Sequence, residues 1–218
     1  MDYKRDQGLG NQVHQYLQSL GVETPFTPGA EPNASLIEES FHKVMAEFGL
    51  DMTNDSLIDT PARLAKMYSY KELFSGLDYR NFPKSTVVAN SMHFDEMVVE
   101  RNIKVSSLCE HHLLPINGSA FVAYIPNEKV IGLSKMNRIV DFFCRRPQIQ
   151  ERLTVQIYHT LAFLLDTPDV AVLIQAEHLC VRHRGVEDPC SDTTTSKLGG
   201  KFLDHTVRSE YLQLCKGF

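Results

Sequence analysis

The chain has 218 residues, of which 43% are hydrophobic and 22% are charged. That length can bury one substantial core, and the balance of apolar and charged residues is typical of a globular protein. A formal net charge of -5 argues against a general nucleic-acid binder, so any anionic ligand must be met by a local basic cluster.

The N-terminal residues carry charges and amides without an apolar stretch. We therefore expect neither a signal peptide nor a membrane span, and we expect a cytoplasmic protein. In that compartment five cysteines at irregular spacing favour free thiols or metal ligands over a disulfide framework.

Helical spacing dominates the first part of the chain. A short helix is predicted around Val13 and Leu17, followed by a loop rich in proline and glycine that extends to residue 32. Asn33 is a capping residue before an amphipathic pattern, which predicts a second helix. A third helix is predicted to begin at Pro61, a residue favoured at the first helical position.

The pattern becomes extended after Pro83. Residues 97–108 alternate apolar and polar side chains, which predicts a half-buried strand leading directly to Cys109. Residues 117–125 predict a second strand, and Pro115 supplies turn chemistry between the two. The two strands are expected to form an antiparallel pair.

The rest of the chain returns to helices and then to strands. Two amphipathic helices are predicted, one from Ser134 and one from about Gln148, and their apolar faces are expected to cover one side of the sheet. Residues 169–182 are predicted to be extended, before a last short strand and helix. This order predicts an α+β fold, with residues 1–95 as an N-terminal helical region and residues 96–218 as the catalytic domain.

Two clusters of metal-binding residue types stand out. Cys109, His111 and His112 lie together with a glutamate in the predicted bend, and His178 and Cys180 end the later strand pattern. If that segment is a strand, His178 and Cys180 face the same way. Zinc accepts thiolate and imidazole ligands, so Cys109, His112 and Cys180 suit a three-ligand site that keeps one position for water.

Spacing alone leaves a second interpretation of the metal site. A closed, four-ligand zinc that only stabilises the fold could use His111 or His178 as the fourth ligand. The presence of both imidazoles beside the ligands favours catalysis, because imidazole is suited to proton transfer near neutral pH.

Basic residues predict an anion site near the same region. Two of them open the helix at Ser134, where free backbone amides also favour negative charge. Glu151, if buried in a pocket, could accept two hydrogen bonds from a guanine. The candidate anion ligands are Arg63, Lys66, Lys135, Arg138 and Arg184.

Eight segments in collinear order, between about residues 58 and 203, resemble GTP cyclohydrolase I. They are Thr60-Pro-Ala-Arg63 with Lys66, Phe74-Ser-Gly-Leu-Asp78, Cys109-Glu-His-His112, Ile131-Gly-Leu-Ser-Lys135, Arg146-Pro-Gln-Ile-Gln-Glu-Arg-Leu153, His178-Leu-Cys180, Arg184-Gly185 and the run from Ser191 to Gly200.

This resemblance implies a tunnelling fold in which antiparallel sheets from several subunits close into a barrel. It further implies a decamer of two pentamers, with active sites assembled at subunit boundaries. The implied reaction is the zinc-dependent hydrolysis of GTP to 7,8-dihydroneopterin triphosphate and formate, the first step of tetrahydrofolate or pterin biosynthesis.

The resemblance also implies roles for individual residues. Cys109, His112 and Cys180 would hold zinc, and His178 would protonate the imidazole ring of GTP as water attacks carbon 8. His111 and Ser134 would assist the later sugar rearrangement. The expected substrate-binding residues are Glu151 at the guanine, Arg63, Lys66, Lys135, Arg138 and Arg184 at the triphosphate, and Gln150.

Three rival functions are weighed against this one. A zinc deaminase pairs His-x-Glu with Pro-Cys-x-x-Cys, but no second cysteine follows Pro189-Cys190 at that spacing. A pterin synthase or nitrile reductase of the same fold is disfavoured by the joint presence of Cys109, His112 and Cys180. A zinc-stabilised interaction module would have four protein ligands and no affinity for GTP.

Overall fold

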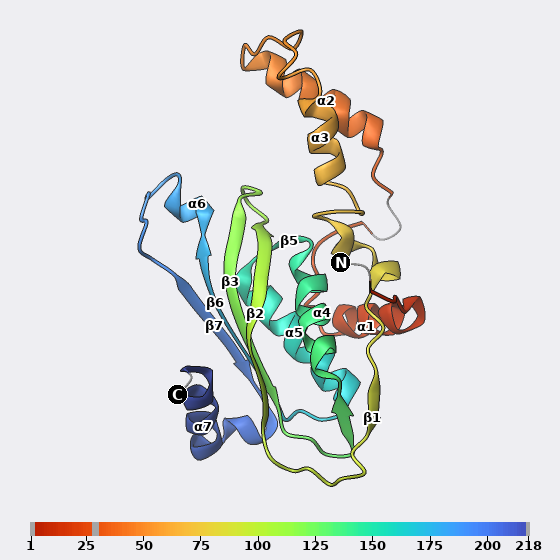
Figure 1. Ribbon diagram of the computed structural model, residues 1–218, viewed down its shortest axis with the longest axis vertical. Helices are drawn as coiled ribbons and strands as arrows, with labels where there is room; N and C mark the ends of the chain where they lie inside the picture. The colour runs from red at the N-terminus through yellow and green to blue at the C-terminus, as the bar shows by residue number, and fades with distance from the viewer. Residues whose placement is uncertain (1–2, 28–30, 217–218) are drawn as a thin grey trace.

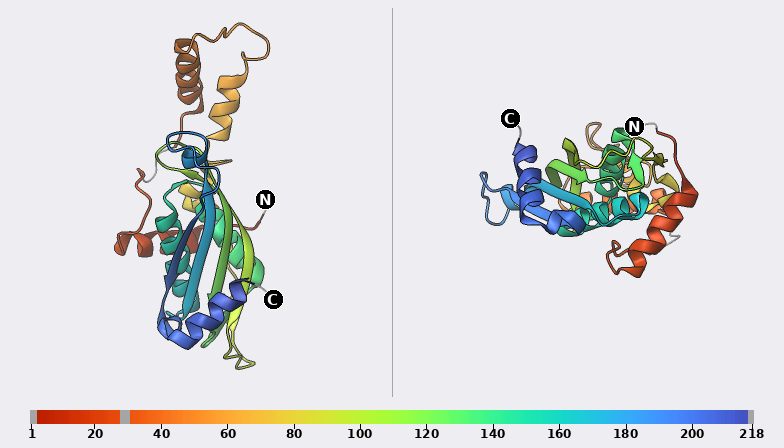
Figure 2. Two further views of the ribbon diagram at one scale, coloured as in Figure 1. Left: turned by 90° about the vertical axis from the view of Figure 1, so that its left-hand side faces the viewer. Right: turned by 90° about the horizontal axis from the view of Figure 1, so that it is seen from below.

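The computed structural model describes residues 3–27 and 31–216, so part of the predicted proline- and glycine-rich loop, residues 28–30, lies outside the described residues. A curled, mostly antiparallel sheet forms the body of the molecule (Figure 1). Helices pack on both faces, and a helical hairpin projects from one end (Figure 2). The predicted α+β class is confirmed.

The main sheet has five strands in the order β5-β2-β3-β6-β7. All neighbours are antiparallel except β5, which pairs with β2 in parallel. The strands are β2 (Val98–Cys109), β3 (Pro115–Tyr124), β5 (Pro147–Gln148), β6 (Val170–His178) and β7 (Thr193–Leu198). A second, two-stranded sheet joins β1 (Val87–Ala89) to β4 (Lys129–Ile131).

The predicted pair of strands around the Cys109 bend is confirmed, because β2 and β3 pair from Leu108 with Pro115 to Val98 with Tyr124. Alternation along β2 places Ile103 and Val105 in the core. Cys109 is the last residue of β2 and is 5% exposed, so the strand fixes its backbone while the bend that follows is open to solvent.

Two long helices cover one face of the sheet, as predicted. They are α4 (Leu133–Cys144) and α5 (Gln150–Leu165), and the main core lies between them and the strands. On the opposite face, α7 (His205–Lys216) follows the short 3-10 helix η3 (Gly200–Leu203) and buries Tyr211, whose hydroxyl donates to the backbone oxygen of Phe121 at 2.8 Å.

The N-terminal helices divide between the body and the projection. Helix α1 (Gln7–Ser19) buries Val13 and Leu17 completely in the main core. Helices α2 (Ala34–Glu47) and α3 (Thr60–Met67) form the projecting hairpin (Figure 1). Asn33 caps α2 as predicted, by accepting from the amide of Leu36 at 3.1 Å. Short 3-10 helices, η1 (Ser75–Leu77) and η2 (Tyr79–Asn81), lead back to the body.

The hairpin leaves much of its apolar surface uncovered in one chain. The amphipathic pattern of α2 is present, but Leu36 is 59% exposed and Phe48, just after the helix, is 76% exposed. Among the described residues no helix combines the length and apolar character needed to cross a membrane.

One predicted element ends early. The segment 169–182 is extended only as far as His178, and residues Leu179–Arg182 form a short helix, α6. His178 and Cys180 therefore do not share one face of a strand, because the backbone turns between them. The expectation that both side chains project together from a strand is wrong.

Candidate metal centre and active site

The bend after β2 is a tight loop held by its own backbone. The amide of Cys109 donates to the oxygen of Leu114, and the amide of Leu113 donates to the oxygen of Cys109, both at 2.8 Å. Leu113 takes a positive φ of 53° to close the loop. The amide of Glu110 donates to the oxygen of Gln148 at 3.0 Å, which ties the loop to β5.

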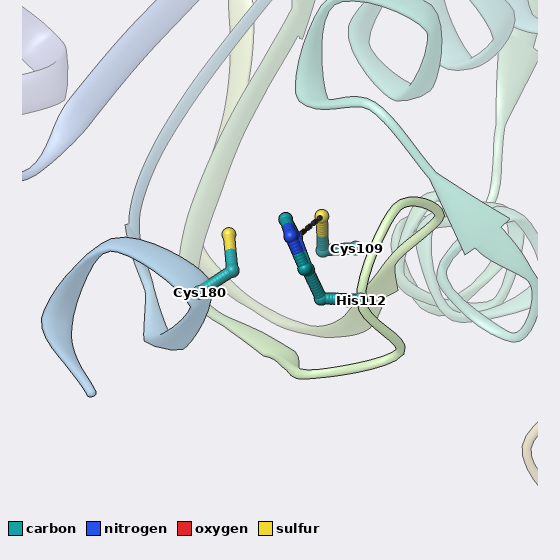
Figure 3. Close-up of side chains that lie close together, drawn as sticks. All are labelled: Cys109, His112 and Cys180. Carbon is teal, nitrogen blue, oxygen red and sulfur yellow. Dashed lines mark hydrogen bonds between the residues drawn. The ribbon is translucent and has the colours of Figure 1, made fainter. Parts of the chain in front are cut away.

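Cys109, His112 and Cys180 converge at the end of the sheet. Their ligand atoms all lie within 4.8 Å of one another, and Figure 3 shows the three side chains pointing towards a common space. The Sγ atom of Cys109 is 4.0 Å from Nδ1 of His112. Two thiols and an imidazole form a donor set that zinc prefers, and the separations fit one ion.

Neither candidate for a fourth protein ligand belongs to this group, within the part of the chain that the structure describes. Nδ1 of His111 is 3.7 Å from Sγ of Cys109, but the His111 side chain is 64% exposed on the rim of the loop. Nε2 of His178 instead contacts the side chain of Gln150 at 2.7 Å. The arrangement matches a three-ligand site better than a closed one.

The two thiols affect each other. Burial raises the pKa of the Cys180 thiol, and hydrogen bonding and charge repulsion from Cys109 raise this pKa further, while Arg184 lowers it. The proximity of the thiols therefore disfavours a negative charge on both of them. A bound cation would remove that repulsion, which is the electrostatic property expected of a metal site.

Gln150 holds His178 in one orientation. The Gln150 side chain is 1% exposed, and its Nε2 donates to the backbone oxygens of Ile174 and Thr193 and to the hydroxyl of Thr195, at 2.9 to 3.1 Å. Its Oε1 consequently faces Nε2 of His178 at 2.7 Å. Because an amide oxygen only accepts, Nε2 of His178 is the donor and carries the hydrogen.

Glu151 lies close enough to His178 to affect its charge. Burial lowers the pKa of His178, and the Glu151 carboxylate opposes that shift. Glu151 itself is exposed in the first turn of α5, so its carboxylate is free to meet a ligand. The amide of Gln150, by contrast, is fully engaged with the protein.

Glu110 pairs with Arg152, one turn into α5. Nη1 of Arg152 donates to Oε2 of Glu110 at 2.5 Å, and Nη2 to Oε1 at 3.4 Å. This two-point contact fixes the metal-site loop against α5.

The candidate anion ligands do not gather in one place within one chain. Arg184 lies at the metal cluster, where its Nη1 contacts Nε2 of His112. Arg63 and Lys66 are exposed on α3, in surface ion pairs with Asp59 at 3.4 Å and Glu72 at 3.8 Å.

Ser134 and Lys135 lie in the first turn of α4, near the opposite end of the sheet from Cys109, and Arg138 lies midway along the helix. Helix α4 begins just after Ile131, whose amide contacts the hydroxyl of Tyr124, and it ends beside β5 near Cys109. At 1.5 Å per residue, the 12-residue helix separates its two ends by roughly 16 Å. Arg138 lies instead over the ring of Tyr3, 5.5 Å from its centroid.

Sequence reasoning did not identify the residues that support the site. It assigned no role to Glu110 or Arg152, and it placed Gln150 with the substrate. The spacing of Arg152 two residues after Gln150 gives no signal of a partner 42 residues earlier. The only available signal was Glu110 itself, a carboxylate between two candidate ligands.

The sequence of the chain is similar to known proteins over almost its whole length. The family model described as GTP cyclohydrolase I matches residues 37–216. A protein named GTP cyclohydrolase 1 from Shewanella denitrificans is 53% identical over 209 residues, which cover 94% of this chain and 96% of the relative. One of the same name from Shewanella oneidensis is 51% identical over the same length and the same shares of both chains.

A solved structure of the archaeosine synthase QueF-Like in its apo form also matches. The TM-score is 0.40 at 18% sequence identity, and the match covers 48% of this chain and 94% of that chain.

Proposed function

The chain belongs to the GTP cyclohydrolase I family, and from this premise we propose which of its residues carry out the reaction. Its activity is that of GTP cyclohydrolase I, which hydrolyses GTP to 7,8-dihydroneopterin triphosphate and formate at the entry to folate and pterin biosynthesis. The roles that we assign to individual residues rest above all on one observation, which is that the side chains of Cys109, His112 and Cys180 converge.

These three residues would hold a zinc ion. When bound, zinc supplies Lewis acidity and lowers the pKa of a water molecule to about 7, so that hydroxide is available at neutral pH. The thiolates and the imidazole of the chain keep the cation at the end of the sheet, and the tight loop after β2 fixes two of the three ligands.

His178 would deliver a proton to the imidazole ring of the guanine as carbon 8 is attacked. The contact with Gln150 supports this role, because it keeps the hydrogen on Nε2 and leaves Nδ1 as the atom that exchanges a proton. Burial lowers the pKa of His178, so the ring releases its proton more readily than a surface histidine does. Gln150 would then contribute to substrate binding indirectly, through the orientation of His178.

Glu151 would anchor the guanine by accepting hydrogen bonds from its amino and ring nitrogen groups. Its exposure and its proximity to His178 support that position. His111, on the rim of the loop, would assist the later rearrangement of the sugar together with Ser134.

The active site would be completed by neighbouring subunits. Measured along α4, Ser134 and Lys135 lie roughly 15 and 13 Å from the helix end that is beside β5 and the metal cluster of their own chain, and Arg138 lies roughly 9 Å from it. We propose that they serve the cluster of an adjacent copy, while Arg63, Lys66 and Arg184 complete the triphosphate site. The open edge of β7 and the uncovered apolar surface of α2 support assembly into a decamer of two pentamers.

Metal analysis tests the ligand assignment. The purified protein, stripped with a chelator and reloaded, is expected to hold about one zinc per chain. Cys180→Ser should hold far less, whereas Cys190→Ser, at an exposed cysteine outside the cluster, should load as the wild type does. Full zinc content in Cys180→Ser would remove Cys180 from the ligand set.

A further inference from the structure

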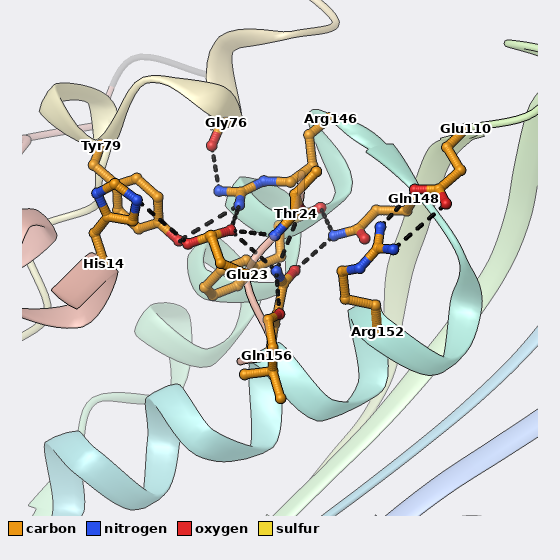
Figure 4. Close-up of polar contacts among 12 residues, drawn as sticks. His14, Glu23, Thr24, Gly76, Tyr79, Glu110, Arg146, Gln148, Arg152 and Gln156 are labelled. Atoms are coloured by element: carbon orange, nitrogen blue, oxygen red, sulfur yellow. Dashed lines mark hydrogen bonds and ion pairs between the residues drawn. The ribbon is translucent and has the colours of Figure 1, made fainter. Parts of the chain in front are cut away.

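The segment between α1 and α2 crosses the body of the molecule beside the strand that supports the metal-site loop. Within this segment Glu23 extends a carboxylate into the interior, where it is 10% exposed (Figure 4). Glu23 lies outside residues 37–216, the part of the chain that matches the family model.

Arg146 is the largest side chain that is completely buried among the described residues. Its Nη1 donates to Oε1 of Glu23 at 3.0 Å, and its Nη2 donates to the backbone oxygen of Gly76. Within residues 3–27 and 31–216, Glu23 is the one carboxylate that pairs with it. The guanidinium lies 4.8 to 5.2 Å from the ring centroids of Tyr79, Phe142 and Phe143. A charge in such surroundings depends strongly on its partner.

Glu23 also meets a second arm of the same network. Nε2 of Gln156 donates to Oε1 of Glu23 at 3.2 Å and to the oxygen of Val22 at 3.0 Å. The other oxygen of Glu23 accepts from the hydroxyl of Tyr79. The side chain of Gln156 is in turn hydrogen-bonded to Gln148. Nε2 of Gln148 donates to Oε1 of Gln156 at 2.7 Å.

Both arms end on the strand β5, which pairs with the end of β2. Arg146 immediately precedes β5, and its backbone oxygen accepts from the hydroxyl of Ser107 at 3.3 Å. Gln148 lies opposite Cys109 in the register, and its oxygen accepts from the amide of Glu110 at 3.0 Å. Glu23 is therefore linked, through two arms of hydrogen-bonded side chains and the backbone of residues 146 and 148, to Ser107 and Glu110, which flank the first metal ligand.

The same segment borders the loop directly. Thr24, Pro25 and Phe26 line a pocket of about 330 Å³ together with Glu110 and His111 of the loop. The segment thus lies beside the metal-site loop as well as being linked to β5.

We propose that Glu23 is a positioning residue for the metal centre, holding β5 and through it the Cys109 loop in the geometry that binds zinc. This inference rests on the metal site proposed above. Residues before position 37, where the match to the family model begins, would then help to shape the metal site without supplying a ligand. Groups that hydrogen-bond directly to metal ligands are commonly worth 10- to 100-fold in metal affinity; because Glu23 acts through intervening side chains, we expect the lower end of that range, about 10-fold.

The test compares Glu23→Gln with the wild type in the full-length protein. After loading with zinc, we measure the rate of zinc loss to a chromogenic chelator at a temperature where both proteins are fully folded. We also measure amide hydrogen exchange in the metal-free protein, over residues 108–113 and over residues 170–176 in the centre of β6. Glu31→Gln is the matched control, because Glu31 is 74% exposed and pairs only with the surface residue Arg80 among the contacts described.

Glu23→Gln leaves the buried charge of Arg146 without its partner, which by itself destabilises the fold. The double variant Glu23→Met with Arg146→Met removes both charges, and such apolar replacements of buried pairs are often neutral or stabilising. The oxygen of Gly76 and the amide of Gln156 each lose one partner, but no charge is left unpaired, so the double variant is expected to be folded at the assay temperature and still to release zinc about 10-fold faster than the wild type.

The expected result is faster zinc loss and faster exchange in residues 108–113, with exchange in residues 170–176 unchanged. Zinc loss at the wild-type rate in the folded double variant would overturn the proposal. Uniformly faster exchange in both regions would do so as well, since it indicates general destabilisation. If the wild type itself binds no zinc, the metal site is refuted and the role of Glu23 in metal binding with it.

Discussion

Replacing Gln150 by Met separates two roles for this residue. The sequence places Gln150 among the substrate-binding residues, whereas in the structure its amide is buried and bonded to the protein on every side. Methionine has a similar shape, and its thioether sulfur is only a weak acceptor in place of the amide oxygen that accepts from Nε2 of His178. The variant therefore frees His178 to rotate or to change its tautomer.

The size of the effect follows from the contacts that are lost. One oriented hydrogen bond of 2.7 Å to a proton-transfer group is removed, and misplacement of such a group costs on the order of 100-fold in rate, or about 2.7 kcal/mol. The carbonyl oxygens of Ile174 and Thr193 each lose one donor, which destabilises the fold by about 2–4 kcal/mol in total. That corresponds to a fall in Tm of roughly 5–15 °C.

Steady-state kinetics on the zinc-loaded protein, well below the Tm of the variant, measure the effect. We expect kcat to fall about 100-fold while KM for GTP and the zinc content stay close to those of the wild type. Gln175→Met is the control, because Gln175 is exposed on β6 and its amide contacts only Asp192 among the described partners. A raised KM with an unchanged kcat would instead identify Gln150 as a direct substrate contact and refute the positioning role.

Three further predictions concern the loop, the assembly and the N-terminal helix. His111→Ser should keep its zinc and lose turnover, and loss of the metal would instead place His111 among the ligands. Mixed oligomers of two inactive variants, Cys109→Ser and Lys135→Ala, should regain activity because some sites receive both intact residues, whereas sites built within one chain would stay inactive. Burial lowers the pKa of His14, so the unfolded chain binds more protons there, and stability is lost as pH falls below the unfolded value of about 6.5. Denaturant titrations should therefore show that the free energy of unfolding falls less between pH 7.5 and pH 5.5 for His14→Phe than for the wild type. Equal falls would contradict a lowered pKa of His14 in the folded protein.

Periodicity predicted the regular elements because burial on one face imposes it. The alternation in β2 and the apolar spacing of α4 and α5 correspond to side chains that the structure buries, including Ile103, Val105 and Ile157. The short helix at Leu179–Arg182 was missed because four residues give no measurable period, and an apolar run continues through it. Cys180 reaches the metal cluster through that turn rather than along a strand.

The metal ligands could be predicted from residue type and spacing, but their supports could not. Two of the ligands are three residues apart in a bend, and few other residue types bind zinc. The pair of Glu23 and Arg146, in contrast, joins positions 123 residues apart, and neither residue is unusual in its local sequence. A sequence without aligned relatives carries no information on such long-range polar contacts.

The separation of Lys135 and Arg138 from the metal cluster was also beyond sequence reasoning. The sequence placed both residues at the start of a predicted helix, where free backbone amides favour an anion, and grouped them with the metal ligands. Because α4 runs along the sheet towards β5, its first turn lies at the far end from Cys109. The direction of a helix relative to its sheet depends on the fold as a whole.

Turnover of GTP by the metal-defined protein tests the account most directly. Purified protein with a known zinc content is incubated with GTP, and formate release is followed together with the fluorescence of the oxidised pterin product. We predict that both products form, that chelation abolishes them, and that zinc restores them. Tightly bound zinc at about one per chain without either product would contradict the account and favour a zinc that only stabilises the fold.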